Sequence, residues 1–222
     1  MLTIVLTRHG HTDRSEPDQY LGQRIDIPIS ARGRSQAEAL HDRLADVTFQ
    51  RVISSPLRRA RETADVGRPT DAIETDDRLM EADYGAWEGH TVADLEARWP
   101  AERAAWEEDP SLVSPPGGET ATDIARRVGP FLAELVAWEA DLGVADAEHR
   151  VLVGGHSTLN RVLLAVALEV SLRDYRRRLR QDWLNLTVLR YPDAGEAARS
   201  GALLLLYNDV AHLRGMRGIT WE

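Results

Sequence analysis

Short apolar runs that alternate with amphipathic stretches constrain this fold more than any other feature of the chain. Short runs at 2–6, 51–53 and 151–153 are rich in apolar and β-branched residues and have the length of buried strands. Stretches with helical periodicity follow at 32–47, 57–66, 119–140 and 159–170, and two further strands are predicted at 184–191 and 202–207, separated by a polar turn at 193–200. This alternation predicts an α/β fold, a three-layer sandwich with a mostly parallel central sheet flanked by helices.

Residues beside two of these helices predict where each helix begins. Ser30 is placed to act as the N-cap of the helix at 32–47. Ser55 and Pro56 suit the cap and first turn of the helix at 57–66. Pro130 falls inside the stretch at 119–140, where a proline can bend a helix.

The length of 222 residues suits a single domain over 1–222. The segment 76–118 is less regular and richer in Trp, Pro and acidic residues than its surroundings. We therefore expect this segment to be an insertion that covers a site in the manner of a lid.

The composition excludes several kinds of chemistry. The chain has no Cys, and all 27 of its basic residues are Arg. Thiolate nucleophiles, Cys-ligated zinc, Schiff-base lysines and P-loop lysines are therefore excluded. A net charge of −9 argues against a nucleic-acid partner. The first apolar run is too short for a signal peptide, and no run approaches the roughly 20 residues of a membrane span. We expect a cytoplasmic protein with no membrane partner.

Polar sequences follow three predicted strands, where function usually lies in open α/β sheets. These sequences are Arg8-His9-Gly10, the run from Ser54 to Arg59, and Gly154-Gly155-His156. We therefore expect two His and at least two Arg to converge from distant parts of the chain. Paired Arg side chains suit the oxygens of phosphate. His9 is the natural nucleophile beside them, because the chain offers no Cys or Lys.

The same residues belong to a longer set of motifs that resembles the histidine phosphatase superfamily, in its phosphoglycerate-mutase-like branch (branch 1). The motifs occur in order as Arg8-His9-Gly10-His11-Thr12, Asp26-Ile27-Pro28-Ile29-Ser30 with Gly33 and Gln36-Ala37, Ser54-Ser55-Pro56-Leu57-Arg58-Arg59-Ala60, Leu79-Met80-Glu81 with Gly85 and Trp87-Glu88-Gly89, Pro116-Gly117-Gly118-Glu119-Thr120, and Gly155-His156-Ser157 with Arg161. The resemblance runs nearly end to end.

The resemblance implies a role for five residues. His9 would attack phosphorus and form a phosphohistidine, which water then hydrolyses. Arg8 and Arg59 would clamp the phosphoryl oxygens, and His156 would stabilise the transferring group. Glu81 would protonate the leaving oxygen and later help to activate water. No cofactor or metal is implied. Arg58, next to the catalytic arginine, is expected on a solvated helix face.

At two positions that contact substrate in the family, this sequence departs from the family's pattern. Ser15 takes the place of an Asn that often contacts phosphate, and Gln23 stands where Gly is usual. We count both, with Ser157, Arg8, Arg59 and His156, as substrate-binding candidates. His11 replaces the usual Glu or Gln and is expected either at the pocket rim or in solvent.

Two other features have ordinary explanations. Arg176-Arg177-Arg178 and Arg180 form a basic cluster that we expect to be a solvated face or an oligomer contact. The Trp residues are expected in the core, with Trp106 as a candidate pocket wall.

The sequence favours a phosphomonoesterase that hydrolyses a small phosphorylated metabolite. A cofactor-dependent phosphoglycerate mutase is the alternative, although the stretch between Glu81 and Gly118 is short for a mutase. A metal-dependent hydrolase, suggested by the His9-Gly10-His11 pattern, and a non-catalytic binding protein are further hypotheses. We also expect that the chain can form a homodimer, since dimers are common among soluble proteins.

Overall fold

The computed structural model describes residues 1–143, 147–192 and 201–213, and its centre is a six-stranded mixed sheet. The strands are β1 (Leu2–Arg8), β2 (Arg51–Ser54), β3 (Ile73–Thr75), β4 (His149–Gly155), β5 (Leu186–Tyr191) and β6 (Leu203–Asp209), in the order β3-β2-β4-β1-β5-β6. The first four strands in this order are parallel, whereas β5 and β6 pair antiparallel. The prediction of a mostly parallel sheet flanked by helices is confirmed.

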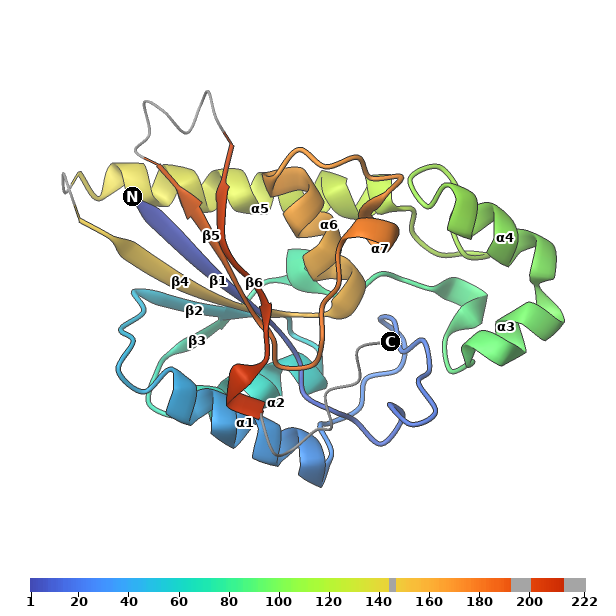
Figure 1. Ribbon diagram of the computed structural model, residues 1–222, viewed down its shortest axis with the longest axis horizontal. Helices are drawn as coiled ribbons and strands as arrows, with labels where there is room; N and C mark the ends of the chain where they lie inside the picture. Colours follow the sequence, from blue (N-terminus) through green and yellow to red (C-terminus); the bar gives the residue numbers. More distant parts are fainter. Residues whose placement is uncertain (144–146, 193–200, 214–222) are drawn as a thin grey trace.

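Helices cover both faces of the sheet, so the molecule has three layers (Figure 1). The helices α1 (Ala31–Arg43) and α2 (Arg58–Gly67) lie on one face, and α5 (Ala121–Asp141) and α6 (Ser157–Ala167) lie on the other. One hydrophobic cluster lies on each face, and β1 contributes to both because alternate residues point in opposite directions. The central strands are buried on both sides, which explains their largely apolar middle residues.

The N-cap predicted for α1 agrees with the structure, whereas the one predicted for α2 does not. Ser30 caps α1 as predicted, since its side chain accepts a hydrogen bond from the Gly33 N–H. The predicted cap of α2 was wrong: this helix begins at Arg58, Leu57 is its N-cap, and the Ser55 hydroxyl is used elsewhere. The helix α5 runs through Pro130.

The segment 76–118 is more regular than predicted. It contains the short 3-10 helices η1 (Asp77–Leu79) and η2 (Gly85–Trp87) and the helices α3 (Val92–Arg98) and α4 (Pro100–Glu108). The last two lie at the end of the molecule where β1 and β4 finish (Figure 1). Trp87 and Trp106 meet edge to face with ring centroids 5.3 Å apart, which joins α4 to the core.

Three further short elements were not predicted: β3, α7 (Tyr175–Arg178) and η3 (Ala211–Leu213). The predicted polar turn at 193–200 lies outside the described residues. Of the helices within the described ranges, none is both long enough and apolar enough to cross a bilayer.

Candidate active site

The order of the sheet brings the three polar strand ends together. The strands β2, β4 and β1 are neighbours and parallel, so the residues that follow them meet at one edge. Beyond the strands, the His9 N–H donates to Gly155 O (3.0 Å) and the Ser55 N–H donates to Gly154 O (2.9 Å). The predicted convergence of two His and two Arg is confirmed, since Arg8, His9 and Arg59 line one cavity and His156 lies beside His9.

His9 is buried and its ring orientation is fixed. Its Nδ1 lies 2.8 Å from Gly10 O, and because a carbonyl can only accept, the ring proton is on Nδ1. The lone pair of Nε2 is therefore free to act as a nucleophile. Burial, followed by the charges of Arg59 and Arg8, holds the pKa of His9 well below 6.5, so the ring is neutral.

His156 is fully buried beside His9, with ring centroids 5.2 Å apart. Its Nε2 lies 2.8 Å from the Ser55 hydroxyl, which itself accepts the Leu57 N–H. The Ser55 hydroxyl keeps its own proton for donation to Nε2, and in that arrangement the ring proton of His156 is on Nδ1. Among the described residues this Nδ1 has no hydrogen-bond partner. Burial and Arg59 also hold the pKa of His156 well below 6.5.

Arg8 and Arg59 are anchored by backbone carbonyls. Arg59 donates from Nη2 to Gly22 O (2.6 Å) and from Nη1 to Ile25 O (3.1 Å). Arg8 donates from Nη1 to Gln181 O (3.0 Å). Burial lowers the pKa of Arg8 to about 10, so its guanidinium is still charged at neutral pH. Two fixed cations thus face the space beside His9.

The carboxylate of Glu81 is held by three backbone N–H groups. Oε1 accepts from Ala82 and Leu159 (both 2.9 Å), and Oε2 accepts from Thr158 (3.2 Å). Thr158 and Leu159 belong to the first turn of α6, where free N–H groups bind anions. The helix that follows His156 therefore orients Glu81.

These side chains surround a cavity of about 220 Å³. The predicted residues in its wall are Arg8, His9, Ser15, Arg59, Glu81 and Ser157. Ser15 is held by the loop, since its hydroxyl accepts the Thr12 N–H at 3.0 Å. His156 is not among the wall residues; it is fully buried and lies beside His9.

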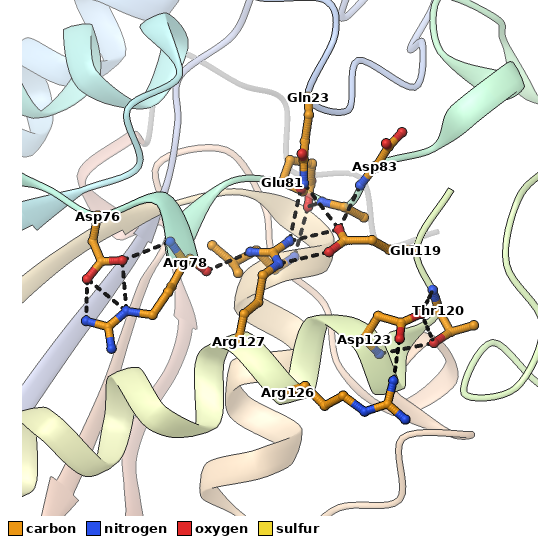
Figure 2. Close-up of polar contacts among 12 residues, drawn as sticks. Gln23, Asp76, Arg78, Glu81, Asp83, Glu119, Thr120, Asp123, Arg126 and Arg127 are labelled. Atoms are coloured by element: carbon orange, nitrogen blue, oxygen red, sulfur yellow. Dashed lines mark hydrogen bonds and ion pairs between the residues drawn. The ribbon is translucent and has the colours of Figure 1, made fainter. Parts of the chain in front are cut away.

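Two other candidates do not reach the cavity wall. Gln23 is not among the wall residues, and its Nε2 donates to Glu81 O (2.7 Å) and to Glu119 Oε2 (3.2 Å) (Figure 2). His11 is buried, so the expectation of a solvated or rim position was wrong, and its Nδ1 is 2.8 Å from the Ser30 hydroxyl. Arg58 is exposed and pairs with Glu62 at 3.1 Å, as predicted for a solvated helix face.

The cavity also contains charged groups that the sequence analysis did not assign to it. Arg161, which was noted only as part of the His156 motif, is in the wall, and the described residues offer its Nε no hydrogen-bond partner. Arg176 is also in the wall and stacks 3.9 Å from the Trp106 ring centroid. The prediction of a solvated face or oligomer contact was therefore wrong for Arg176, although Arg177, Arg178 and Arg180 are exposed. Trp106 was wrongly predicted as pocket wall, since it supports Arg176 from within the core. Asp18 is also in the wall, and its charge interacts with Arg8 and Arg161.

Within the described ranges, no group of three His, Asp or Glu side chains is arranged to hold a metal ion. His11, the second member of the His9-Gly10-His11 pattern, is hydrogen-bonded to Ser30.

Comparison with known proteins agrees with this geometry. The sequence model of the histidine phosphatase superfamily (branch 1) matches residues 4–202. Glucosyl-3-phosphoglycerate phosphatase of Mycobacterium tuberculosis is 38% identical over 175 residues, which cover 78% of each chain. The enzyme of that name from Mycolicibacterium vanbaalenii is 35% identical over 167 residues, 74% of this chain and 73% of the relative.

Solved structures agree as well. The native structure of mycobacterial glucosyl-3-phosphoglycerate phosphatase has a TM-score of 0.81 and 33% identity, covering 93% of this chain and 98% of that one. Its complex with inorganic phosphate has the same TM-score and identity and covers 95% and 98%. These relatives are phosphatases, so a mutase is not favoured. The chain belongs to the histidine phosphatase superfamily (branch 1) and is a phosphoric monoester hydrolase.

Proposed function

We propose that the chain hydrolyses its substrate in two steps through a phosphohistidine at His9. The hydrogen bond from His9 Nδ1 to Gly10 O is the main support, because it leaves Nε2 as the free nucleophile between Arg8 and Arg59. In the first step Nε2 forms a bond to phosphorus while the bond from phosphorus to the leaving oxygen breaks. Glu81 supplies the proton that the leaving oxygen needs.

In the second step the same groups act in reverse. Water attacks phosphorus and gives its proton to Glu81, and the bond between phosphorus and Nε2 breaks to release phosphate. Arg8, Arg59 and the Nδ1–H of His156 stabilise the charge on the phosphoryl oxygens in both steps. Ser15 and Ser157 line the cavity and can contact the substrate, whereas Gln23 acts behind Glu81. The segment 76–118, which supplies Glu81, Tyr84 and Val92 to the cavity wall, covers the substrate.

We further propose that the substrate is a phosphorylated acid such as glucosyl-3-phosphoglycerate. The named relatives support this choice, and so does the charge of the cavity. Beyond the Arg8 and Arg59 pair, Arg161 and Arg176 supply two more cations, and Arg161 Nε has no partner among the described residues. A carboxylate on the leaving group can satisfy such a guanidinium.

The test measures phosphate release from glucosyl-3-phosphoglycerate and from a sugar phosphate that has no carboxylate. We expect a higher kcat/KM for glucosyl-3-phosphoglycerate. Arg161→Met should lower kcat/KM by about 10- to 100-fold for that substrate alone, the cost of a hydrogen bond to a charged group. Equal kcat/KM values for the two substrates would contradict the choice of substrate and leave the two-step chemistry untouched.

The cytoplasmic location and the homodimer stay predictions from the sequence. Sedimentation of the purified chain tests the homodimer.

A further inference from the structure

A mostly buried ion pair lies directly behind Glu81 (Figure 2). Arg127 donates from Nε to Glu119 Oε1 and from Nη2 to Glu119 Oε2, both at 3.1 Å. The side chains are only 18% and 22% exposed. Neither residue is in the cavity wall, so the pair does not contact the substrate.

The Arg127 guanidinium also holds the chain that carries Glu81. Nη1 donates to Arg78 O at 2.6 Å, and Nη2 donates to Glu81 O at 3.1 Å. One rigid group thus fixes both ends of a four-residue segment. Gln23 Nε2 adds a second donor to Glu81 O at 2.7 Å. Only the planar fork of an arginine, with its several N–H groups, can reach these acceptors together.

Glu119 fixes the chain on the other side of Glu81. Its Oε2 accepts the Asp83 N–H at 2.9 Å, and its own N–H donates to Asp83 O at 2.8 Å. Glu119 directly precedes Thr120, the N-cap of α5, which forms a capping box with Asp123. The segment around Glu81 is therefore tied to the start of a 21-residue helix.

The position of Glu81 depends on this anchoring. The carboxylate oxygens are bound by N–H groups of Ala82, Thr158 and Leu159, which set the direction of the side chain. The backbone of Glu81 is bound instead by Arg127 and Gln23. A shift of about 1 Å in a reacting group can lower a rate about 100-fold. Loss of the backbone anchor should therefore affect proton transfer before it affects phosphate binding.

We propose that Arg127, paired with Glu119, is a positioning residue that holds Glu81 where it can protonate the leaving oxygen. The proposal rests on the role of Glu81 in the proposed function. It differs from a purely structural role because it assigns the effect to one chemical event, the protonation of the leaving group.

The experiment compares two substrates that differ in their need for that proton. The leaving group of p-nitrophenyl phosphate departs as a stable anion, whereas that of glycerol phosphate must be protonated. The value of kcat/KM reports on the first step, transfer to His9. Arg127→Met should lower kcat/KM by about 100-fold for glycerol phosphate and by less than about 3-fold for p-nitrophenyl phosphate.

Arg126→Met is the matched control. Arg126 is the neighbouring residue on α5, has a 72% exposed side chain and pairs with Asp123 (Figure 2). We expect unchanged kcat/KM for both substrates. Arg127→Met leaves the Glu119 charge without its partner and can prevent folding, so Arg127→Met with Glu119→Met is measured as well, since removing both charges avoids that cost. The double variant should show the same selective loss.

Glu81→Gln, measured in parallel, separates the two proposals. A selective loss for glycerol phosphate in Glu81→Gln supports the proton donor, and the same loss in the Arg127 variants supports the positioning role. Equal losses for both substrates in the Arg127 variants, beside a selective loss in Glu81→Gln, would overturn the positioning role alone. Equal losses in Glu81→Gln would overturn the proposed donor.

Discussion

The hydrogen bond between Ser55 and His156 offers a sharp test of how the site is built. The Ser55 hydroxyl lies 2.8 Å from His156 Nε2, and both residues are fully buried. Ser55→Ala leaves a buried ring nitrogen without a partner, which costs about 1–3 kcal/mol of stability. For a chain of this size that loss corresponds to a decrease of about 2–12 °C in Tm.

The same substitution should slow catalysis. Without Ser55 the His156 ring is free to turn, and the Nδ1–H that we propose as a donor to the phosphoryl group loses its fixed direction. Loss of a hydrogen bond to a charged group costs about 1.5–3 kcal/mol, or about 10- to 100-fold in kcat/KM. Ser54→Ala is the control, because the Ser54 hydroxyl is equally buried but donates to Ser55 O at 3.0 Å.

The assay measures phosphate release from p-nitrophenyl phosphate by both variants, with Tm determined by calorimetry. We expect a large decrease in kcat/KM for Ser55→Ala and a small one for Ser54→Ala. A Ser55→Ala enzyme with kcat/KM within about twofold of the Ser54→Ala enzyme would refute the role of this hydrogen bond.

Further predictions concern pH and backbone packing. Because burial and two arginines lower the pKa of His9, kcat/KM corrected for substrate ionisation should stay level as the pH falls through 6.5; a decrease centred at 6.5 would contradict the lowered pKa. The pKa values of His9 and His156 are lower in the folded chain than the 6.5 of an unfolded one, so the unfolded chain binds more protons below pH 6.5. The free energy of unfolding, measured by urea titration, should therefore have its maximum value above pH 6.5 and decrease at lower pH. The decrease should be smaller in His156→Asn. Gly33→Ala would place a Cβ 2.2 Å from His11 O, so the urea midpoint should fall by the equivalent of about 1–3 kcal/mol, and an unchanged midpoint would contradict this packing.

The central sheet could be predicted because its strands are buried on both faces and read as apolar runs. The strands β1 and β4 show this most clearly, since each is followed directly by a His. The parallel pairing of the two strands brings both His to the same edge of the sheet. The strand β3 could not be predicted, because Ile73 is the only apolar residue among its three. It depends on pairing with β2 rather than on its own pattern.

The positions of His9 and His156 could be predicted because these residues follow strands, whereas Glu81 was identified only through the family resemblance. Residues that depend on tertiary contacts were missed. Arg176 looks like part of a surface cluster, and only its stacking on Trp106 reveals that it faces the cavity. Ser55 looks like a helix cap, because a hydroxyl before Pro56 fits that role equally well. Arg127 gave no signal, since nothing in the local sequence shows that its partners include the carbonyl of Glu81.

Trapping of the phosphoryl group tests the central claim most directly. Rapid-quench reaction with labelled phosphomonoester, followed by mass spectrometry of alkaline digests, should find an acid-labile phosphoryl group on His9 that forms and decays at rates compatible with kcat. The adduct should be absent from His9→Ala. Phosphate release at an unchanged rate with no label on His9, or with the label on another residue, would contradict the account.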